Sequence, residues 1–136
     1  MVYKTKRSDL RVQNYEVENF KKNGYAGKHI LADFWFGKKI EKKEKLERIL
    51  LAAAKKAKSN PLGINIYQFE PQGLTGVVLL SESHIAIHTW PEIGYIAIDI
   101  FTCGTESMPN KALDFLRKEI SPKKEKIKEI KRGEEL

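Results

Sequence analysis

The chain has 136 residues, of which 41% are hydrophobic and 32% are charged. This length suits one compact domain, and the apolar fraction is sufficient for a core. No segment approaches the roughly 20 apolar residues of a membrane-spanning helix, the charged N-terminus lacks the apolar run of a secretory signal, and a single cysteine cannot form an internal disulfide. We therefore expect a soluble cytoplasmic protein with no membrane association.

The net charge of +7 suggests a nucleic-acid-binding module. Most of the excess lies near the two ends of the chain, within residues 1–12 and 123–132. Acidic residues are interleaved with the C-terminal lysines, which is typical of a solvated face, and the chain lacks the alternating aromatic and basic residues of a base-stacking surface. We therefore expect no nucleic-acid partner, and this function is kept as a distant alternative.

Residues 1–24 are polar and are expected to form an N-terminal extension, whereas residues 25–136 are expected to form a single domain.

Apolar and polar residues alternate over 28–36, which predicts a strand. Residues 44–58 have the spacing of an amphipathic helix, with lysines opposite an apolar stripe. The stripe consists of Leu46, Ile49, Leu50, Ala53 and Ala57.

Four further strands are predicted in the centre of the chain. Residues 64–70 and 74–81 are rich in apolar and β-branched residues, and the Pro-Gln-Gly sequence between them indicates a turn. Residues 84–90 and 95–103 follow, joined by the four-residue sequence PEIG. The short connections favour antiparallel hairpins.

The last part of the chain is predicted to contain one more helix. Pro109 suits the first turn of a helix that continues to about Ile120, and Pro122 ends it. The residues that this helix is expected to bury are Ala112, Phe115, Leu116 and Ile120. Ile127 and Ile130 lie in a charged tail, where a short strand and a helix fit the pattern equally well. The element order predicts an α+β fold, a two-layer α/β sandwich with a mostly antiparallel sheet.

The hairpin of residues 84–90 and 95–103 divides its side chains between two faces. Its expected cross-strand pairs are Trp90 with Tyr95, His88 with Ala97, Ala86 with Asp99, and His84 with Phe101. The face expected to pack against the helices contains Ile85, Ile87, Ile96, Ile98 and Ile100. The opposite face carries His84, His88, Tyr95, Asp99 and Cys103, with Ser83 at the start of its strand. This concentration of reactive side chains indicates a candidate site.

Each of these residues also has a structural interpretation. A single histidine is more often structural than catalytic, and a single cysteine usually behaves as a small hydrophobic residue. Cys103, His88 and Asp99 would also suit a cysteine hydrolase. Residue types and spacing alone therefore leave the reaction open.

Residues 80–104, LSESHIAIHTWPEIGYIAIDIFTCG, resemble the signature segment of prokaryotic-type S-adenosylmethionine decarboxylase proenzymes. Residues 27–35 and 69–80 are similar to earlier motifs of that family, and residues 131–133 to its C-terminal pattern. The resemblance covers residues 27 to 133. Because an archaeal branch of the family acts on arginine, the resemblance leaves two substrates open.

The resemblance implies that the chain cleaves itself between Glu82 and Ser83 into residues 1–82, the beta chain, and 83–136, the alpha chain. Ser83 would become a pyruvoyl group, whose ketone condenses with the substrate amine and accepts the electrons released with carbon dioxide. His88 matches the proton acceptor of the cleavage reaction, and Cys103 matches the proton donor of the decarboxylation. Neither a metal ion nor pyridoxal phosphate is expected.

The implied reaction is the conversion of S-adenosylmethionine to its decarboxylated form, the aminopropyl donor for spermidine and other polyamines. The alternative is a pyruvoyl-dependent arginine decarboxylase that makes agmatine. Family members are homodimers whose active sites draw on both subunits, and we expect a homodimer here. A symmetric partner would also cover a site on an open sheet face and exclude water from it.

The binding residues follow from the resemblance as well. Phe69 matches an aromatic residue that stacks on adenine, Glu92 matches an acid that binds ribose, and Asp33 lies where an acidic residue is near the active site. Thr75 takes the place of a serine that assists cleavage. The chain departs from many relatives at Ile93 and at Asn110, where tyrosine and tryptophan are common. Two further residues, His29 and His84, match family histidines whose roles the resemblance leaves open.

Overall fold

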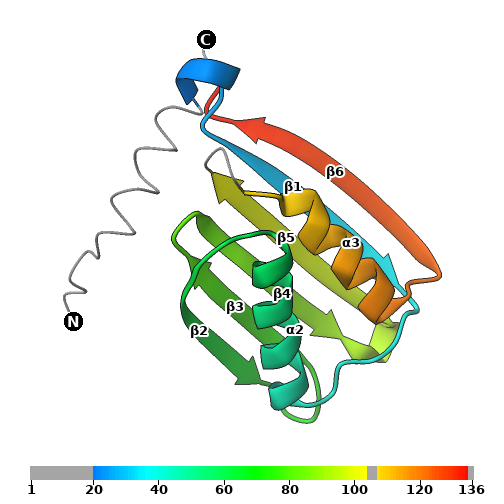
Figure 1. Ribbon diagram of the computed structural model, residues 1–136. Helices are drawn as coiled ribbons and strands as arrows, with labels where there is room; N and C mark the ends of the chain where they lie inside the picture. The colour runs from blue at the N-terminus through cyan, green and yellow to red at the C-terminus, as the bar shows by residue number, and fades with distance from the viewer. Residues whose placement is uncertain (1–19, 104–106, 135–136) are drawn as a thin grey trace.

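A six-stranded sheet and two helices on one of its faces form the fold of the computed structural model (Figure 1). The structure describes residues 20–103 and 107–134. In chain order the elements are β1 (Gly27–Trp35), α2 (Lys43–Lys56), β2 (Pro61–Gln68), β3 (Leu74–Leu80), β4 (Ser83–Trp90), the 3-10 helix η1 (Pro91–Ile93), β5 (Tyr95–Cys103), α3 (Pro109–Ile120) and β6 (Lys124–Arg132). The strand order is β2-β3-β4-β5-β1-β6, and neighbouring strands are antiparallel. The predicted two-layer α+β architecture is confirmed.

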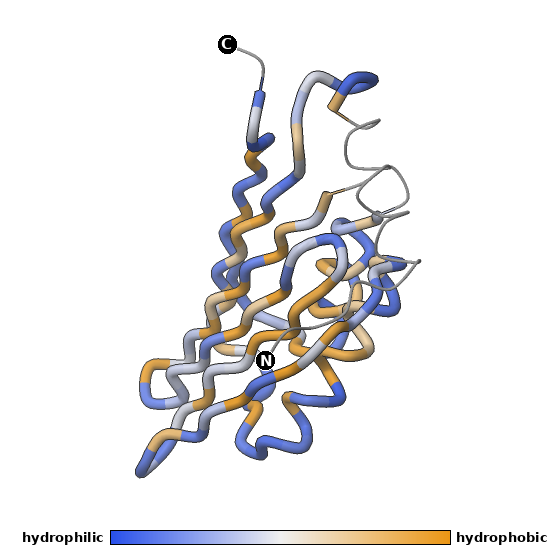
Figure 2. The backbone as a smooth tube through the Cα atoms, turned by 90° about the vertical axis from the view of Figure 1, so that its left-hand side faces the viewer, coloured by the Kyte–Doolittle hydropathy of each residue, from blue (hydrophilic) through white to orange (hydrophobic). Residues whose placement is uncertain are grey.

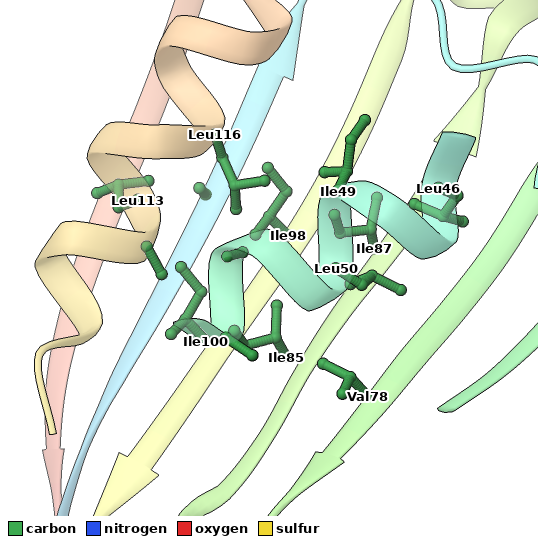
Figure 3. Packing of buried hydrophobic residues seen from close by; sticks show 14 of the residues in the cluster. Leu46, Ile49, Leu50, Val78, Ile85, Ile87, Ile98, Ile100, Leu113 and Leu116 are labelled. Carbon is green, nitrogen blue, oxygen red and sulfur yellow. The ribbon is translucent and has the colours of Figure 1, made fainter. Parts of the chain in front are cut away.

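The core lies between the sheet and the two helices (Figure 3). The α2 stripe predicted from the sequence is buried throughout, and Leu46 and Leu50 have no exposed surface. The five isoleucines predicted for the inner face of the β4–β5 hairpin are also buried, namely Ile85, Ile87, Ile96, Ile98 and Ile100. Helix α3 spans the predicted residues and buries Leu116 completely, whereas Phe115 packs against the rim of the core and is only partly buried.

The end of β1 differs from the prediction. The alternating pattern predicts a strand that includes Phe36, but the strand ends at Trp35 and the Phe36 side chain is 58% exposed. Phe36 has a φ of 57° and donates its backbone N–H to the carbonyl oxygen of Gly94 at 2.7 Å. The chain therefore turns away from the sheet one residue earlier than its apolar pattern indicates.

The β4–β5 register agrees with all four predicted pairs, including His88 with Ala97 and Ala86 with Asp99. In Figure 2 apolar and polar residues alternate along the strands. Because side chains alternate between the two faces, this register places the two histidines of β4 on the face opposite the helices. We call this helix-free side of the sheet the open face.

The C-terminal strand resolves the alternative that the sequence left open. Residues Lys124–Arg132 form a strand along β1 at the edge of the sheet. Ile127 faces the helices and packs against the core, while Ile130 pairs with His29 on the open face. Within the described part of the chain, no helix has the length and apolarity needed to cross a membrane.

Candidate active site

The predicted cleavage site lies in the tight turn between β3 and β4. Leu80 pairs with Ser83, so Ser81 and Glu82 are the two turn residues, and the Glu82–Ser83 bond leads directly into β4. Ser83 has a φ of 148°, which residues with a Cβ adopt rarely. A backbone conformation of this kind costs on the order of 1–3 kcal/mol and persists only where the surroundings enforce it.

Backbone hydrogen bonds hold this turn from two sides. The Cys103 N–H donates to the Glu82 carbonyl oxygen at 2.9 Å, and this carbonyl belongs to the peptide bond expected to break. The Asn60 N–H donates to Glu82 Oε2 at 2.9 Å, and the Ser81 N–H donates to the Asn60 carbonyl oxygen at 2.9 Å. The Glu82 side chain is therefore anchored in a buried position.

Two histidines and an aspartate lie on the open face close to this turn. His29 on β1 and His84 on β4 are on either side of β5, which carries Asp99 and Phe101. The His29 and His84 ring centroids are 6.3 Å apart, and His29 Nε2 is 3.9 Å from an Asp99 oxygen. Burial lowers the pKa of His29 below its ordinary value, and the Asp99 carboxylate counteracts this effect only in part.

A second group of predicted residues lies at the other end of the open face. Thr75 Oγ1 is 3.1 Å from His88 Nδ1, across the β3–β4 pair. Both residues line an open pocket of about 270 Å³. The complete lining consists of Phe69, Gln72, Gly73, Thr75, His88, Thr89, Trp90 and Glu92. The pocket thus combines an aromatic surface, a carboxylate and a hydrogen-bonded histidine.

Asp33 on β1 is linked to this pocket through Tyr95, a partner that no sequence pattern indicates. The Tyr95 hydroxyl donates a hydrogen bond to Asp33 Oδ1. The Tyr95 ring stacks between Trp35 and Trp90, with centroid distances of 4.4 Å and 5.2 Å. Burial and then the bond to Asp33 raise the pKa of Tyr95 to about 12. At neutral pH the phenol therefore keeps its proton and remains a donor.

The structure brings the predicted residues together as two groups. Glu82, Ser83 and Cys103 form the first, which we call the cleavage end, and the pocket with Asp33 forms the second, the pocket end. Ser83 and His88 are five residues apart on β4, a distance of about 16 Å along the strand. Within one chain, His88 therefore cannot reach Ser83.

Three residues shape these two ends through contacts that the sequence does not reveal. Asn60 acts through its backbone, which leaves no sequence signal. Tyr95 and Trp90 were placed on the correct face by the hairpin register, but their contacts with Asp33 and with the pocket depend on long-range pairing. The neighbourhood of His29 and Asp99 likewise requires β1 to lie beside β5.

Residues 28–133 match the protein family described as S-adenosylmethionine decarboxylase. A protein from Methanococcus maripaludis strain S2, described as S-adenosylmethionine decarboxylase proenzyme, is 40% identical over 109 residues, which cover 79% of this chain and 89% of the relative. A protein of the same description from Prochlorococcus marinus strain MIT 9313 is 42% identical over 109 residues, covering 79% and 87%.

The fold has a counterpart among solved structures. The crystal structure of the adenosylmethionine decarboxylase from Aquifex aeolicus VF5 has a TM-score of 0.75 and 40% sequence identity, and the match covers 81% of this chain and 92% of that one. The fold and the relatives together define a small α+β decarboxylase. The chain belongs to the S-adenosylmethionine decarboxylase family, as its signature segment predicted.

Proposed function

We propose that this chain is a self-cleaving, pyruvoyl-dependent S-adenosylmethionine decarboxylase, cut between Glu82 and Ser83. The observation that carries the proposal is the hydrogen bond from the Cys103 N–H to the carbonyl oxygen of Glu82. A donor fixed on the bond to be broken stabilises the negative charge that develops on its oxygen. The word proenzyme in the descriptions of the relatives is consistent with such a cleavage.

The cleavage chemistry follows from the turn. The Ser83 hydroxyl attacks the Glu82 carbonyl carbon, the peptide C–N bond breaks, and an ester forms while the Cys103 N–H stabilises the oxyanion. Removal of the Ser83 α-proton then breaks the Cβ–O bond and releases the Glu82 carboxylate. The remaining dehydroalanine takes up water and loses ammonia to give the keto group.

The conformation of Ser83 favours cleavage. Its φ of 148° is costly for an L-residue with a Cβ. Breaking the Glu82–Ser83 peptide bond abolishes this dihedral angle and releases its cost. The pyruvoyl group would supply an electron sink for decarboxylation, and Cys103, held next to Glu82, is placed to donate a proton.

The hydrogen bond between Thr75 and His88 supports a role of His88 as proton acceptor. If His88 Nδ1 carries the hydrogen and donates to Thr75 Oγ1, then Nε2 is free to accept a proton. Because Ser83 of the same chain is about 16 Å away along β4, this proton acceptor must come from His88 of the partner subunit.

The open face is suited to pairing with a second copy. It exposes Leu79, Val77 and Trp90, whose side chains are 55%, 37% and 40% accessible in the single chain. Apolar side chains of this size on one sheet face are typical of an interface. If two open faces pack about a twofold axis, the cleavage end of one subunit can meet the pocket end of the other.

The pocket end supports S-adenosylmethionine as the substrate. Phe69 offers a flat surface, 47% exposed, on which an adenine can stack, and Glu92 offers a carboxylate for two ribose hydroxyls. The acids Asp33 and Glu92 also favour a cationic substrate. With these residues binding S-adenosylmethionine, the product is decarboxylated S-adenosylmethionine, the aminopropyl donor for polyamine synthesis.

The cysteine hydrolase is disfavoured by geometry. His88 pairs with Ala97, and Cys103 is six residues further along β5, about 20 Å away. A cysteine and histidine of one chain at this distance cannot form a catalytic pair.

Mass spectrometry of the denatured protein tests the cleavage. Wild-type chain should separate into residues 1–82 and a fragment that begins at residue 83 with a blocked N-terminus, and Ser83→Ala should remain one chain. Carbon dioxide release from carboxyl-labelled S-adenosylmethionine and from labelled arginine then tests the substrate. A single uncleaved wild-type chain would refute the mechanism, and faster turnover of arginine would refute the substrate.

A further inference from the structure

The cluster formed by His29, His84 and Asp99 on the open face has the chemistry of a metal site. Each residue offers one ligand atom, and these three atoms lie within 4.8 Å of one another. They come from three neighbouring strands, β1, β4 and β5, so the sheet register fixes their positions. We propose that His29, His84 and Asp99 bind one zinc ion.

A buried nitrogen without a hydrogen-bond partner supports a metal site at this place. Among the described residues, His29 Nε2 is buried and has no hydrogen-bond partner, and its 3.9 Å separation from Asp99 is too long for a hydrogen bond. A buried polar atom without a partner normally costs about 1–3 kcal/mol. A metal ion between His29 and Asp99 would satisfy both groups.

The ligand type and geometry favour zinc. Two imidazoles and a carboxylate suit Zn²⁺, whereas Mg²⁺ and Ca²⁺ prefer oxygen ligands alone. Bonds of about 2.0–2.2 Å in a tetrahedral site place ligand atoms roughly 3.3 Å apart. The observed separations must therefore shorten by about 0.6–1.5 Å, which rotation about the broad terminal torsions of His and Asp allows. Three protein ligands leave the fourth position open, as in zinc sites that bind a further small ligand.

Charged groups near this cluster both favour and oppose the binding of a cation. The Asp99 carboxylate, 3.9 Å from His29 Nε2, attracts a cation. Arg132 opposes cation binding, and its guanidinium lies over the Phe101 ring at 5.0 Å from the centroid.

Zinc at this position would inhibit turnover, a consequence that rests on the proposed function. His84 directly follows Ser83, so the ion lies beside the group that carries out the decarboxylation. A carboxylate loses its negative charge as carbon dioxide leaves. If the substrate carboxylate takes the open fourth position of the ion, zinc stabilises the ground state more than the transition state.

Zinc titration of the untagged, metal-depleted protein against a chromophoric chelator tests the site. Wild-type and uncleaved Ser83→Ala chains should each bind one ion per chain, and zinc should raise their melting temperatures. Asp99→Asn and His29→Asn should bind at least about tenfold more weakly. His88→Asn, the matched histidine control, should bind zinc as wild type does.

The site is refuted if the protein does not bind zinc stoichiometrically. It is also refuted if a folded Asp99→Asn or His29→Asn variant keeps the zinc affinity of wild type, or if His88→Asn loses as much zinc affinity as these variants. Binding to the Ser83→Ala chain does not depend on cleavage, so it separates a failure of this site from a failure of the decarboxylase mechanism. In the wild-type enzyme, inhibition should follow zinc occupancy, and full turnover at saturation would refute the inhibitory role.

Discussion

Cys103 contributes two groups to the cleavage end, and the structure separates their roles. Its backbone N–H holds the Glu82 carbonyl oxygen, whereas its thiol is the proposed proton donor during turnover. Substitution of the side chain leaves the backbone donor in place. Cys103→Ala should therefore still cleave, while its rate of carbon dioxide release falls by roughly 10²- to 10⁴-fold, the usual size of acid catalysis.

Two measurements on the same sample check this separation. Mass spectrometry reports the cleaved fraction, and carbon dioxide release per cleaved chain reports turnover. Cys103→Ser, which retains a donor, serves as the control and should lose less activity. Normal turnover by cleaved Cys103→Ala would exclude the thiol from the mechanism.

The Tyr95–Asp33 pair gives the protein a pH dependence in the alkaline range. The Tyr95 pKa is about 12 in the folded chain and about 10 when unfolded. Because the folded pKa is the higher one, the stabilisation is complete below pH 10 and is lost as the pH rises from about 10 to 12. Tyr95→Phe should lower the free energy of unfolding by about 1 kcal/mol at neutral pH.

Urea unfolding of wild type and Tyr95→Phe at a series of pH values measures this difference. The gap should be constant from pH 7 to about 9 and should shrink above pH 10. A gap that does not depend on pH would show that the phenolic proton is not involved.

At the level of the elements, helix α2 and strand β3 meet at Gly76. A Cβ at this position would lie 2.8 Å from Leu46 Cδ2 and 2.9 Å from Leu50 Cδ1. Both leucines are fully buried, so neither can move without disturbing the core (Figure 3). Gly76→Ala should therefore reduce the free energy of unfolding by about 1–3 kcal/mol, as overpacking does.

Gly63 on β2 provides the control for this substitution. A Cβ there meets no atom within 4 Å, so Gly63→Ala should not be destabilising. Chemical denaturation of both variants makes the comparison. Equal stability of Gly76→Ala and wild type would show that α2 packs less tightly against β3 than the structure indicates.

The same elements show what could be predicted from the sequence. The four-residue connection determined the β4–β5 register, because a short hairpin leaves few alternative pairings. The insertion of β1 between β5 and β6 joins segments far apart in the chain, and no local pattern encodes it. The contacts of Asp33 with Tyr95 and of His29 with Asp99 follow from that insertion, and so they were missed. In β6, two isoleucines three residues apart fit either period, and pairing with β1 decides for a strand.

For the whole molecule, the central expectation is an active site shared between two subunits. The cleavage end and the pocket end of one chain are separated by most of the length of β4. The family signature could predict the residues of both ends, but only the three-dimensional arrangement reveals that one chain keeps them apart. The open face with its exposed Leu79 and Val77 supplies a surface through which two copies can bring them together.

Mixed dimers test this arrangement directly. A Ser83→Ala chain retains His88 but has no serine to convert, and a His88→Ala chain retains Ser83 but lacks the proton acceptor. Each should stay uncleaved, or nearly so, when expressed alone. When the two are co-expressed, the His88→Ala chain should be cleaved, because His88 of the partner subunit completes its site. Random pairing places up to about half of these chains in mixed dimers, which sets the maximum yield. Mass spectrometry distinguishes the two chains.

As a control, adding Leu79→Asp to the His88→Ala chain should prevent pairing of the open faces and abolish the rescue. If the mixture remains as uncleaved as the separate chains, the shared active site is wrong.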